Sequence, residues 1–177
     1  MKRLGLTEMI QAKYPEQVTI VVTVGECGRA NVIPLSWVTQ VSLNPHRFVV
    51  AIGNEQYSQR LLEQSGEFVL AFPNKTQARE VVFCGTRSGR SVNKELESGF
   101  TFIPSTQIAP PLVEGCLSNL ECKLISQHNA GDHTLYVGEV VAAHIEKEAR
   151  EKTEGMYYLG GELFGSIRKI ETLEEHL

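Results

Sequence analysis

Residues 31–68 read NVIPLSWVTQVSLNPHRFVVAIGNEQYSQRLLEQSGEF, and this stretch decides the fold. The runs 30–43 and 47–53 are rich in β-branched and apolar residues, so both are predicted to be extended, the second as a buried strand. Segment 56–66 has the composition of a two-turn helix. Ser58 heads this helix, where a hydroxyl, free backbone N–H groups and the helix dipole attract an anion. The stretch therefore predicts a phosphate-binding helix start between strands.

The flanking segments add more strands than helices. The β-branched run 18–24 is predicted to form a hairpin with the run that follows the turn 25–29. Pro34 cannot donate to a β-ladder, so it is placed at an edge or a bulge. Further predicted elements are a strand at 67–72, a helix capped by Asn74 and Gln77, a short helix from about Ser91, an irregular connection at 104–115, two long strands after Leu117 joined by the turn 129–132, and a short strand at Met156–Tyr158.

Hairpins dominate these connections, so the chain is predicted to be mainly β, an antiparallel sheet with a few short helices. Closing such a sheet into a barrel removes its exposed edges. The length of 177 residues fits a single domain, 1–177. Residues 1–15 are predicted to be a peripheral N-terminal segment, and residues 167–177 an acidic C-terminal tail.

Composition excludes several classes of function. The formal net charge is -4, and there is no basic stripe of the kind that nucleic-acid binding needs. No apolar run approaches the roughly 20 residues that span a bilayer, and the N-terminus lacks the apolar core of a signal peptide, so a cytoplasmic protein without membrane contact is expected. The four cysteines are too scattered for a disulfide framework, and no spacing of cysteine or histidine predicts a metal site.

A series of short motifs runs through the chain in a fixed order. They are Asn31-x5-Trp37, Val41–Pro45, Tyr57-Ser58, Gly66–Phe68, Asn93-Lys94, Pro111-Leu112, Leu120–Cys122, Gly131-Asp132-His133 and Val137–Val140. Over residues 16–166 this series resembles the flavin reductase-like, flavoredoxin-type branch of the FMN-binding split-barrel proteins. The resemblance implies a Greek-key antiparallel split barrel that forms homodimers, holds FMN at the barrel rim near the subunit interface and passes electrons through the flavin.

Two residues match the positions that hold the FMN phosphate. A phosphate dianion needs a cation and aligned donors, and Lys94 is expected to supply the first and Ser58, with its helix start, the second. The family most often has threonine at the Ser58 position, so the hydroxyl is kept. The alternatives are a solvated helix lysine for Lys94 and simple helix capping for Ser58.

The isoalloxazine ring needs hydrogen bonds along its pyrimidine edge and a flat apolar surface elsewhere. The resemblance assigns the edge to the backbone of the extended segment 36–42, so the expected cofactor-binding residues there are Ser36, Trp37, Val38, Thr39 and Ser42. Trp37 is also expected to supply apolar area or contact the phosphate side, and Asn31 to bond the ribityl chain or the ring. A buried core role for Trp37 and ordinary turn chemistry for Asn31 are the alternatives.

His133 follows a tight turn and begins a strand, so its ring is held at a defined place. In the similar reductases the matching histidine lies near the flavin and the nicotinamide, so His133 is the expected catalytic as well as cofactor-binding residue. Phe164 falls where the family places an aromatic residue that covers the ring. A histidine in a turn with no function is the alternative for His133.

The resemblance leaves three functions open. The first is an FMN-binding, flavoredoxin-like oxidoreductase with tightly held FMN, which the sequence Asn93-Lys94-Glu95 favours over a reductase that releases reduced flavin. The second is an NAD(P)H:flavin reductase that uses FMN as a dissociable substrate. The third is a module that binds flavin or haem without redox turnover. The physiological donor, whether NADH, NADPH or a protein, and the acceptor are not specified by the sequence.

Overall fold

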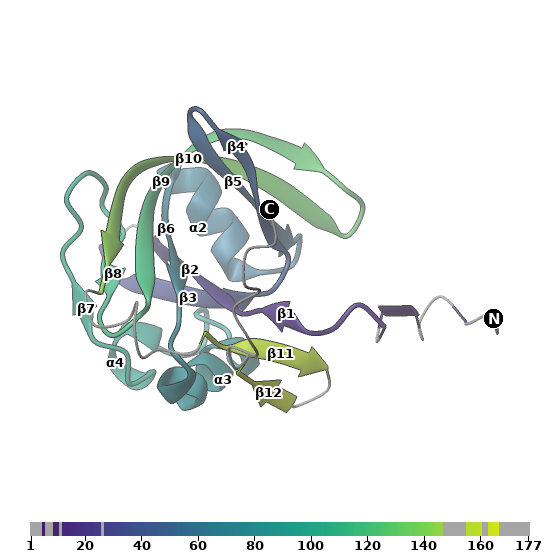
Figure 1. Cartoon of the computed structure of the whole chain (residues 1–177). Coiled ribbons are helices and arrows are strands. Elements are labelled where there is room, and N and C mark those ends of the chain that lie inside the picture. The colour runs from purple at the N-terminus through teal and green to yellow at the C-terminus, as the bar shows by residue number, and fades with distance from the viewer. Residues whose placement is uncertain are drawn as a thin grey trace, which may run out of the picture.

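The computed structural model describes residues 5, 9–10, 12–25, 27–146, 155–160 and 163–166. A seven-stranded antiparallel sheet in the order β3-β2-β6-β9-β10-β5-β4 forms the body (Figure 1). Its strands are β2 (Thr19–Val24), β3 (Ala30–Leu35), β4 (Val38–Leu43), β5 (His46–Gly53), β6 (Glu67–Phe72), β9 (Ser118–Asn129) and β10 (His133–Ile145). Two small sheets are formed by β1 (Glu16–Gln17), β11 (Tyr157–Gly160) and β12 (Leu163–Gly165), and by β7 (Phe102–Ile103) and β8 (Leu112–Val113).

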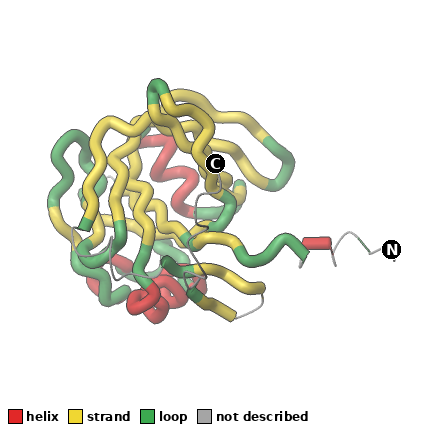
Figure 2. The backbone as a smooth tube through the Cα atoms, viewed as in Figure 1, coloured by secondary structure: helices red, strands yellow, loops and turns green. Residues whose placement is uncertain are grey.

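The helices are α2 (Tyr57–Ser65), the 3₁₀ turn η1 (Lys75–Gln77), α3 (Ala78–Thr86) and α4 (Lys94–Glu97). In Figure 2 the strands form a curved wall around α2, whereas the other helices gather below it. The expectation of a mainly β, antiparallel barrel with few short helices is confirmed.

The two edge strands of the main sheet, β3 and β4, are consecutive in the chain. Only Ser36 and Trp37 separate them, so the sheet curls until its edges are joined covalently, and Ala51 N–H donates to the Trp37 carbonyl at 3.0 Å. The prediction of one extended run at 30–43 was wrong at this point. Pro34 does lie on an edge strand, as predicted, because its missing N–H costs no ladder bond there.

Strands β2, β3 and β6 are buried on both faces, which explains their nearly continuous apolar sequences. Alternate residues enter two separate cores. Val21, Ile33 and Leu70 point into the barrel, where Leu62 of α2 packs against them. The opposite faces of these strands pack against α3 and β8 in a second core that includes Ile20, Val32, Val69, Val81 and Val113.

Several local predictions are confirmed. Gly66 ends α2 in the left-handed conformation with φ of 66°, and its N–H donates to the Leu62 carbonyl at 2.8 Å. Asn74 and Gln77 form a capping box. Cys122 packs in the barrel core as expected, and burial raises the pKa of its thiol to about 12.

Other boundaries differ. The short helix expected from about Ser91 begins at Lys94, and Leu112–Val113, within a connection expected to be irregular, pair with β7 as a two-residue strand. The acidic tail 167–177 lies outside the described residues, as does most of the segment 1–15, so their expected roles stay predictions. Among the described residues no helix is long and apolar enough to cross a membrane.

Candidate functional site

A cavity of about 250 Å³, here called the central cavity, lies between β3, the end of β5, the first turn of α2 and the loop that follows α3. Four residues predicted for the site line it together: Asn31, Ser58, Lys94 and His133. They come from β3, α2, α4 and β10, so the barrel brings together positions more than 100 residues apart in the chain.

Asn31 is 5% exposed and holds Ser58 in place. Its side-chain amide nitrogen donates to Ser58 Oγ at 2.8 Å and, more weakly, to Thr23 Oγ1 at 3.4 Å. Because Ser58 Oγ accepts this bond, its own proton remains available for an acceptor in the cavity. Asn31 Oδ1 is buried without a partner among the described residues. Turning the amide over would exchange the two atoms and still leave one unpaired, which is costly unless a ligand pairs with it.

Ser58 is the second residue of α2 and lies two residues after the N-cap. The N-cap is Gln56, and its side chain makes no capping hydrogen bond. The capping alternative for Ser58 was therefore wrong, and among the described residues no side chain caps the first N–H groups of α2. With the Ser58 hydroxyl, which faces the same cavity, the helix start is a set of donors suited to an anion.

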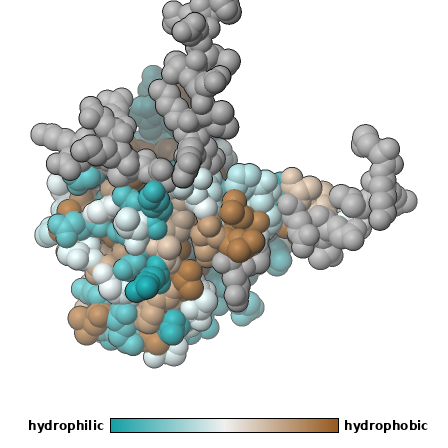
Figure 3. Space-filling view, turned by 60° about the horizontal axis from the view of Figure 1, so that its bottom comes forward, coloured by the Kyte–Doolittle hydropathy of each residue, from teal (hydrophilic) through white to brown (hydrophobic). Residues whose placement is uncertain are grey.

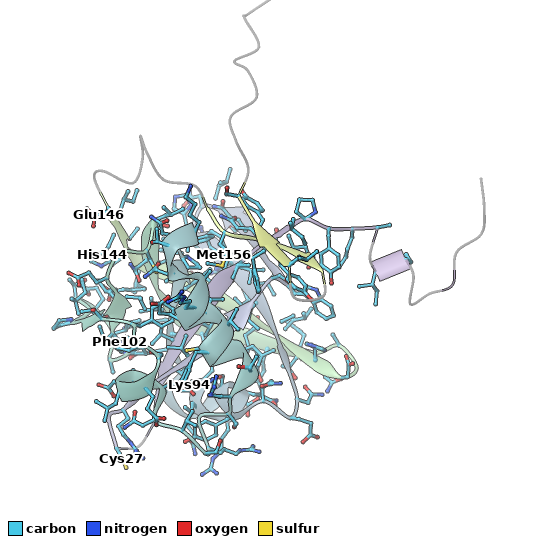
Figure 4. All side chains as sticks on the ribbon, turned by 90° about the horizontal axis from the view of Figure 1, so that it is seen from below. Cys27, Lys94, Phe102, His144, Glu146 and Met156 are labelled. Atoms are coloured by element: carbon cyan, nitrogen blue, oxygen red, sulfur yellow. The ribbon has the colours of Figure 1, made fainter. Side chains whose placement is uncertain are left out.

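Lys94 is 4% exposed, so it is not a solvated helix lysine. Its Nζ donates to the carbonyls of Val32 and Cys84, each at 2.7 Å. Burial lowers the pKa of the ammonium, an effect that the nearby Cys84 thiol partly opposes. In the described part of the chain the third N–H has no acceptor. Figure 4 shows Lys94 inside the outline of the molecule and Cys27 at its edge.

Arg87 and Ser88 also line the central cavity, and sequence reasoning missed both. The Arg87 guanidinium lies over the Phe83 ring, 4.3 Å from its centroid, and is exposed. Within the described residues no carboxylate pairs with it. The Ser88 carbonyl accepts from Ser91 and Val92 N–H at 3.0 and 3.1 Å, so the loop is folded back on itself. Nothing in a glycine- and serine-rich loop sequence distinguishes a cavity wall from a solvated turn.

Trp37, at the junction of β3 and β4, lies against His133, which lines the central cavity. Their ring centroids are 4.7 Å apart with planes inclined by 41°. Trp37 is 44% exposed, so the core alternative for it was wrong. The Lys13 ammonium also lies over the Trp37 ring, 4.7 Å from the indole centroid. These contacts form an exposed aromatic wall.

His133 is oriented by its neighbour Asp132. Its Nδ1 lies 2.7 Å from Asp132 Oδ1, and this hydrogen bond lowers the pKa of the carboxyl. The Nε2 edge lies beside Gly53, the residue opposite His133 in the β5–β10 ladder, and Gly53 also lines the central cavity. With Nδ1 paired, Nε2 is the ring nitrogen left for a ligand.

Phe164 lies in a neighbouring apolar cavity of about 640 Å³, which includes Ser36 and shares Pro34, Leu35 and Gly85 with the central cavity. The Phe164 ring packs against Tyr158 at 5.6 Å. Figure 3, which brings the lower side of Figure 1 forward, shows hydrophobic atoms gathered near the middle of this face. The two cavities therefore adjoin, and together they are here called the groove, with the central cavity as its polar end and the neighbouring cavity as its apolar end.

The rest of segment 36–42 turns away from this groove. Val38 and Thr39 line a separate cavity of about 360 Å³, beside Phe48 and Phe72. Ser42 lines none of the cavities described above and follows a bulge after Gln40. These residues turn away because the extended segment is broken at Trp37. After the break, β4 pairs with β5 and does not continue β3.

The sequence and the fold match known proteins. The family model described as "Flavin reductase like domain" matches residues 11–165. An uncharacterized protein of Pyrococcus abyssi is 36% identical over 138 residues, 78% of each chain. The NADH-dependent FAD reductase of Streptomyces globisporus is 28% identical over 148 residues, 84% of this chain and 78% of that protein.

A crystal structure gives the same result for the fold. The FMN-binding protein from Thermus thermophilus, with bound p-hydroxybenzaldehyde, superposes with a TM-score of 0.85 at 27% identity, covering 99% of this chain and 98% of the other. Because the family model spans nearly all of the described barrel, this chain belongs to the flavin reductase-like family.

Proposed function

We propose that this chain is an FMN-binding oxidoreductase that acts as a homodimer with one tightly held FMN per subunit. The observation that carries the proposal is the central cavity, where Asn31, Ser58 and Arg87 form the polar end of the groove. His133 lines the same cavity and lies against Trp37. Family membership and the likeness to the FMN-binding protein of Thermus thermophilus support it.

The polar end of the groove fits a phosphate dianion. Ser58 has a hydroxyl proton free to donate, and the first turn of α2 offers N–H groups that no side chain of the described residues caps. Arg87 supplies an exposed guanidinium, the group best suited to paired phosphate oxygens. Lys94 adds a buried positive charge behind this end, with one N–H left for an oxygen. We assign the phosphate to these groups.

The rest of the groove fits the ribityl chain and the ring. Asn31 Oδ1 is buried and unpaired, so it can accept a hydrogen bond that a ribityl hydroxyl donates. Pro34 and Leu35 offer apolar surface, and Phe164 stands where it can cover the ring. The backbone of Ser36 and Trp37, between the two edge strands, is the part of segment 36–42 that we assign to the pyrimidine edge. Roles for Val38, Thr39 and Ser42 rest on the resemblance alone.

When bound, FMN supplies a ring that accepts and donates hydride or single electrons. The chain's own contribution is to bind, orient and protect that ring. His133, with Nδ1 held by Asp132, presents Nε2 toward the cavity, where it can donate a hydrogen bond or carry a proton. Such a group stabilises negative charge that develops on a reacting partner. We assign His133 this catalytic role.

A second candidate is an NAD(P)H:flavin reductase that releases its flavin. The similarity to the NADH-dependent FAD reductase of Streptomyces globisporus favours it, as does the exposure of Trp37 and Arg87. In this candidate the same residues bind the flavin, and affinity alone differs.

The experiment is a visible absorption spectrum of the purified protein, followed by anaerobic addition of NADH or NADPH. The proposal predicts a flavin band that remains after gel filtration and bleaches with a suitable donor. Flavin lost on gel filtration, with rapid NADH oxidation that depends on added FMN, would favour the dissociable-substrate candidate. No flavin band and no uptake of added FMN would contradict both.

A further inference from the structure

His133 is carried by the turn 129–133, which joins β9 and β10. The turn closes on itself, because Ala130 N–H donates to the His133 carbonyl at 2.8 Å. Inside it, Asn129 Oδ1 accepts from Gly131 N–H at 3.1 Å, and Gly131 has a φ of 97°, which side chains rarely adopt. These bonds shape the turn, and contacts outside it must fix its place beside the cavity.

Asn54, the residue directly after β5, bonds to this turn on both sides of His133. Its side-chain nitrogen donates to the Gly131 carbonyl at 2.9 Å, and its backbone N–H donates to the Asp132 carbonyl at 3.0 Å. Its Oδ1 accepts from Thr134 Oγ1 at 2.9 Å. Of the described residues outside the turn, Asn54 is the only one that hydrogen-bonds to Gly131 or Asp132. Three bonds from one residue therefore enclose position 133.

The exposure of Asn54 separates these bonds from the stability of the core. Its side chain is exposed, and it lines none of the cavities described above. A solvated amide gains little free energy when it exchanges water for protein partners. The three bonds therefore matter chiefly for geometry, because they set where the turn stands against the end of β5.

The place of the turn decides the place of the imidazole. His133 lies opposite Gly53 in the β5–β10 ladder, and Gly53, directly before Asn54, lines the central cavity. From this position the ring bonds to Asp132 through Nδ1 and lies against the Trp37 indole. A shift of the turn by about 1 Å would move the ring relative to the cavity, and a displacement of that size can slow a reaction about a hundredfold.

We propose that Asn54 is a positioning residue, which holds the imidazole of His133 in the place that reaction at the flavin requires. The inference rests on the proposed function, which gives His133 its catalytic role. Asp132 sets the rotation of the ring through Nδ1, whereas Asn54 sets the place of the backbone that carries the ring. Because Asn54 lines neither cavity of the groove, its effect on the reaction passes through His133.

The test measures flavin reduction and flavin binding separately in Asn54→Ala and Thr134→Val. The first variant removes both side-chain bonds of Asn54, and the second removes one of them. Reduction of bound FMN by saturating NADH or NADPH is expected to slow about tenfold in Asn54→Ala and about threefold in Thr134→Val, with FMN affinity within about twofold. If Asn54→Ala fails to fold, Thr134→Val decides the question. Gln127→Ala is the matched control, because Gln127 is an exposed amide of β9 that lines neither cavity of the groove.

Two further measurements distinguish positioning from a general structural role. In a His133→Ala protein, adding Asn54→Ala is expected to leave the reduction rate unchanged, because no ring is left to position. In flavin-free protein, Asn54→Ala is expected to shift the Trp37 emission toward that of His133→Ala, because the indole and the imidazole are in contact. Gln127→Ala should leave this emission as it is in the wild type.

The outcomes separate this inference from the proposed function. An Asn54→Ala protein that reduces FMN as fast as the wild type would overturn the inference. Equal slowing by Asn54→Ala with and without the His133 ring would also overturn it, because Asn54 would then act by another route. Both results leave the proposed function standing. If His133→Ala itself reduced FMN at the wild-type rate, or if neither nucleotide reduced the FMN, the catalytic role assigned to His133 would fail and the inference with it.

Discussion

The indole of Trp37 and the imidazole of His133 lie against each other at a centroid distance of 4.7 Å with their planes inclined by 41°, although one follows the edge strand β3 and the other begins β10. The closure of the barrel at Ser36–Trp37 produces this contact, because it carries the chain from β3 across to β5 and β10. The result is an aromatic wall beside the cavity in which Asn31, Ser58 and Lys94 meet.

Trp37 is the one tryptophan of the chain, so its emission reports on this wall. Binding of FMN is expected to quench that emission strongly, because the flavin absorbs where tryptophan emits and the ring is placed next to it. Fluorescence titration with FMN measures the effect, and a Trp37→Phe variant supplies the background. Unchanged Trp37 emission at saturating FMN would place the ring elsewhere.

Removing the phosphate contacts should discriminate between flavins. Ser58→Ala and Arg87→Ala are each expected to weaken FMN about tenfold and riboflavin by much less, because only FMN carries the phosphate. Lys94→Ala is expected to act in the same direction. Calorimetry with both ligands makes the comparison, with Arg79→Ala as the exposed control. Equal losses for riboflavin and FMN would remove the phosphate role from these residues.

His133→Ala should separate chemistry from binding. The ring is held by Asp132 and Trp37 at the side of the cavity, so its loss is expected to slow flavin reduction about a hundredfold while FMN affinity changes by about threefold or less. Anaerobic stopped-flow absorbance gives the reduction rate. An unchanged rate in a variant that still binds FMN would show that His133 is only part of the wall.

The carboxylate of Glu121 holds the 104–110 loop through hydrogen bonds. We therefore predict that the folded protein loses stability in acid. It is fully buried and accepts from Thr106 N–H and Oγ1, Gln107 N–H and His144 Nε2 at 2.6–2.8 Å. Burial by itself raises the carboxyl pKa, but these hydrogen bonds outweigh it and lower the pKa from 4.5 to about 2.

A pKa below the unfolded value means that the unfolded chain binds the proton more tightly. The stabilisation by Glu121 is therefore complete above pH 4.5 and is lost as pH falls toward 2. Relative to Glu121→Gln, the wild type is expected to lose about 3 kcal/mol over that interval. Urea unfolding at pH 5.5 and pH 2 of both proteins measures the difference. Parallel pH profiles of the two proteins would show that the carboxylate is not stabilised by its charge.

Close packing against a neighbouring ring explains why residue 138 of the Val137–Val140 motif is a glycine. A β-carbon there would come within 2.4 Å of the Phe68 ring, so Gly138→Ala is expected to destabilise the fold by about 1–3 kcal/mol. Phe68→Leu in the same chain should recover part of the loss. Gly85→Ala is the control, because the nearest atom to its added carbon is 3.6 Å away. Denaturant unfolding that finds Gly138→Ala as stable as the wild type would contradict the tight packing.

Local signals in the sequence predicted most of the fold. Gly66, the capping box of Asn74 and the turn at 129–132 act over a few residues, so their effects are readable in one chain. The break at Ser36–Trp37 was not predicted, because the whole of 30–43 has the composition of an extended segment and only the closing of the whole barrel assigns its halves to different partners.

The candidate site was also predicted only in part. Asn31, Ser58, Lys94 and His133 are brought to one cavity as expected. The carbonyl partners of Lys94 and the cavity position of Arg87 were missed. The sequence around a lysine or arginine in a loop or at a helix start does not show whether its side chain faces solvent or a cavity. Val38, Thr39 and Ser42 share the extended pattern of Ser36 yet turn away with β4.

The most direct test of the flavin site is a titration of flavin-free protein with FMN and, separately, with riboflavin, followed by flavin fluorescence. We predict saturation at one FMN per chain and an affinity for riboflavin that is lower by about a hundredfold, since the phosphate contacts are lost together. Failure of FMN to bind, or riboflavin binding as tightly as FMN, would contradict the central claim that this cavity grips a phosphorylated flavin.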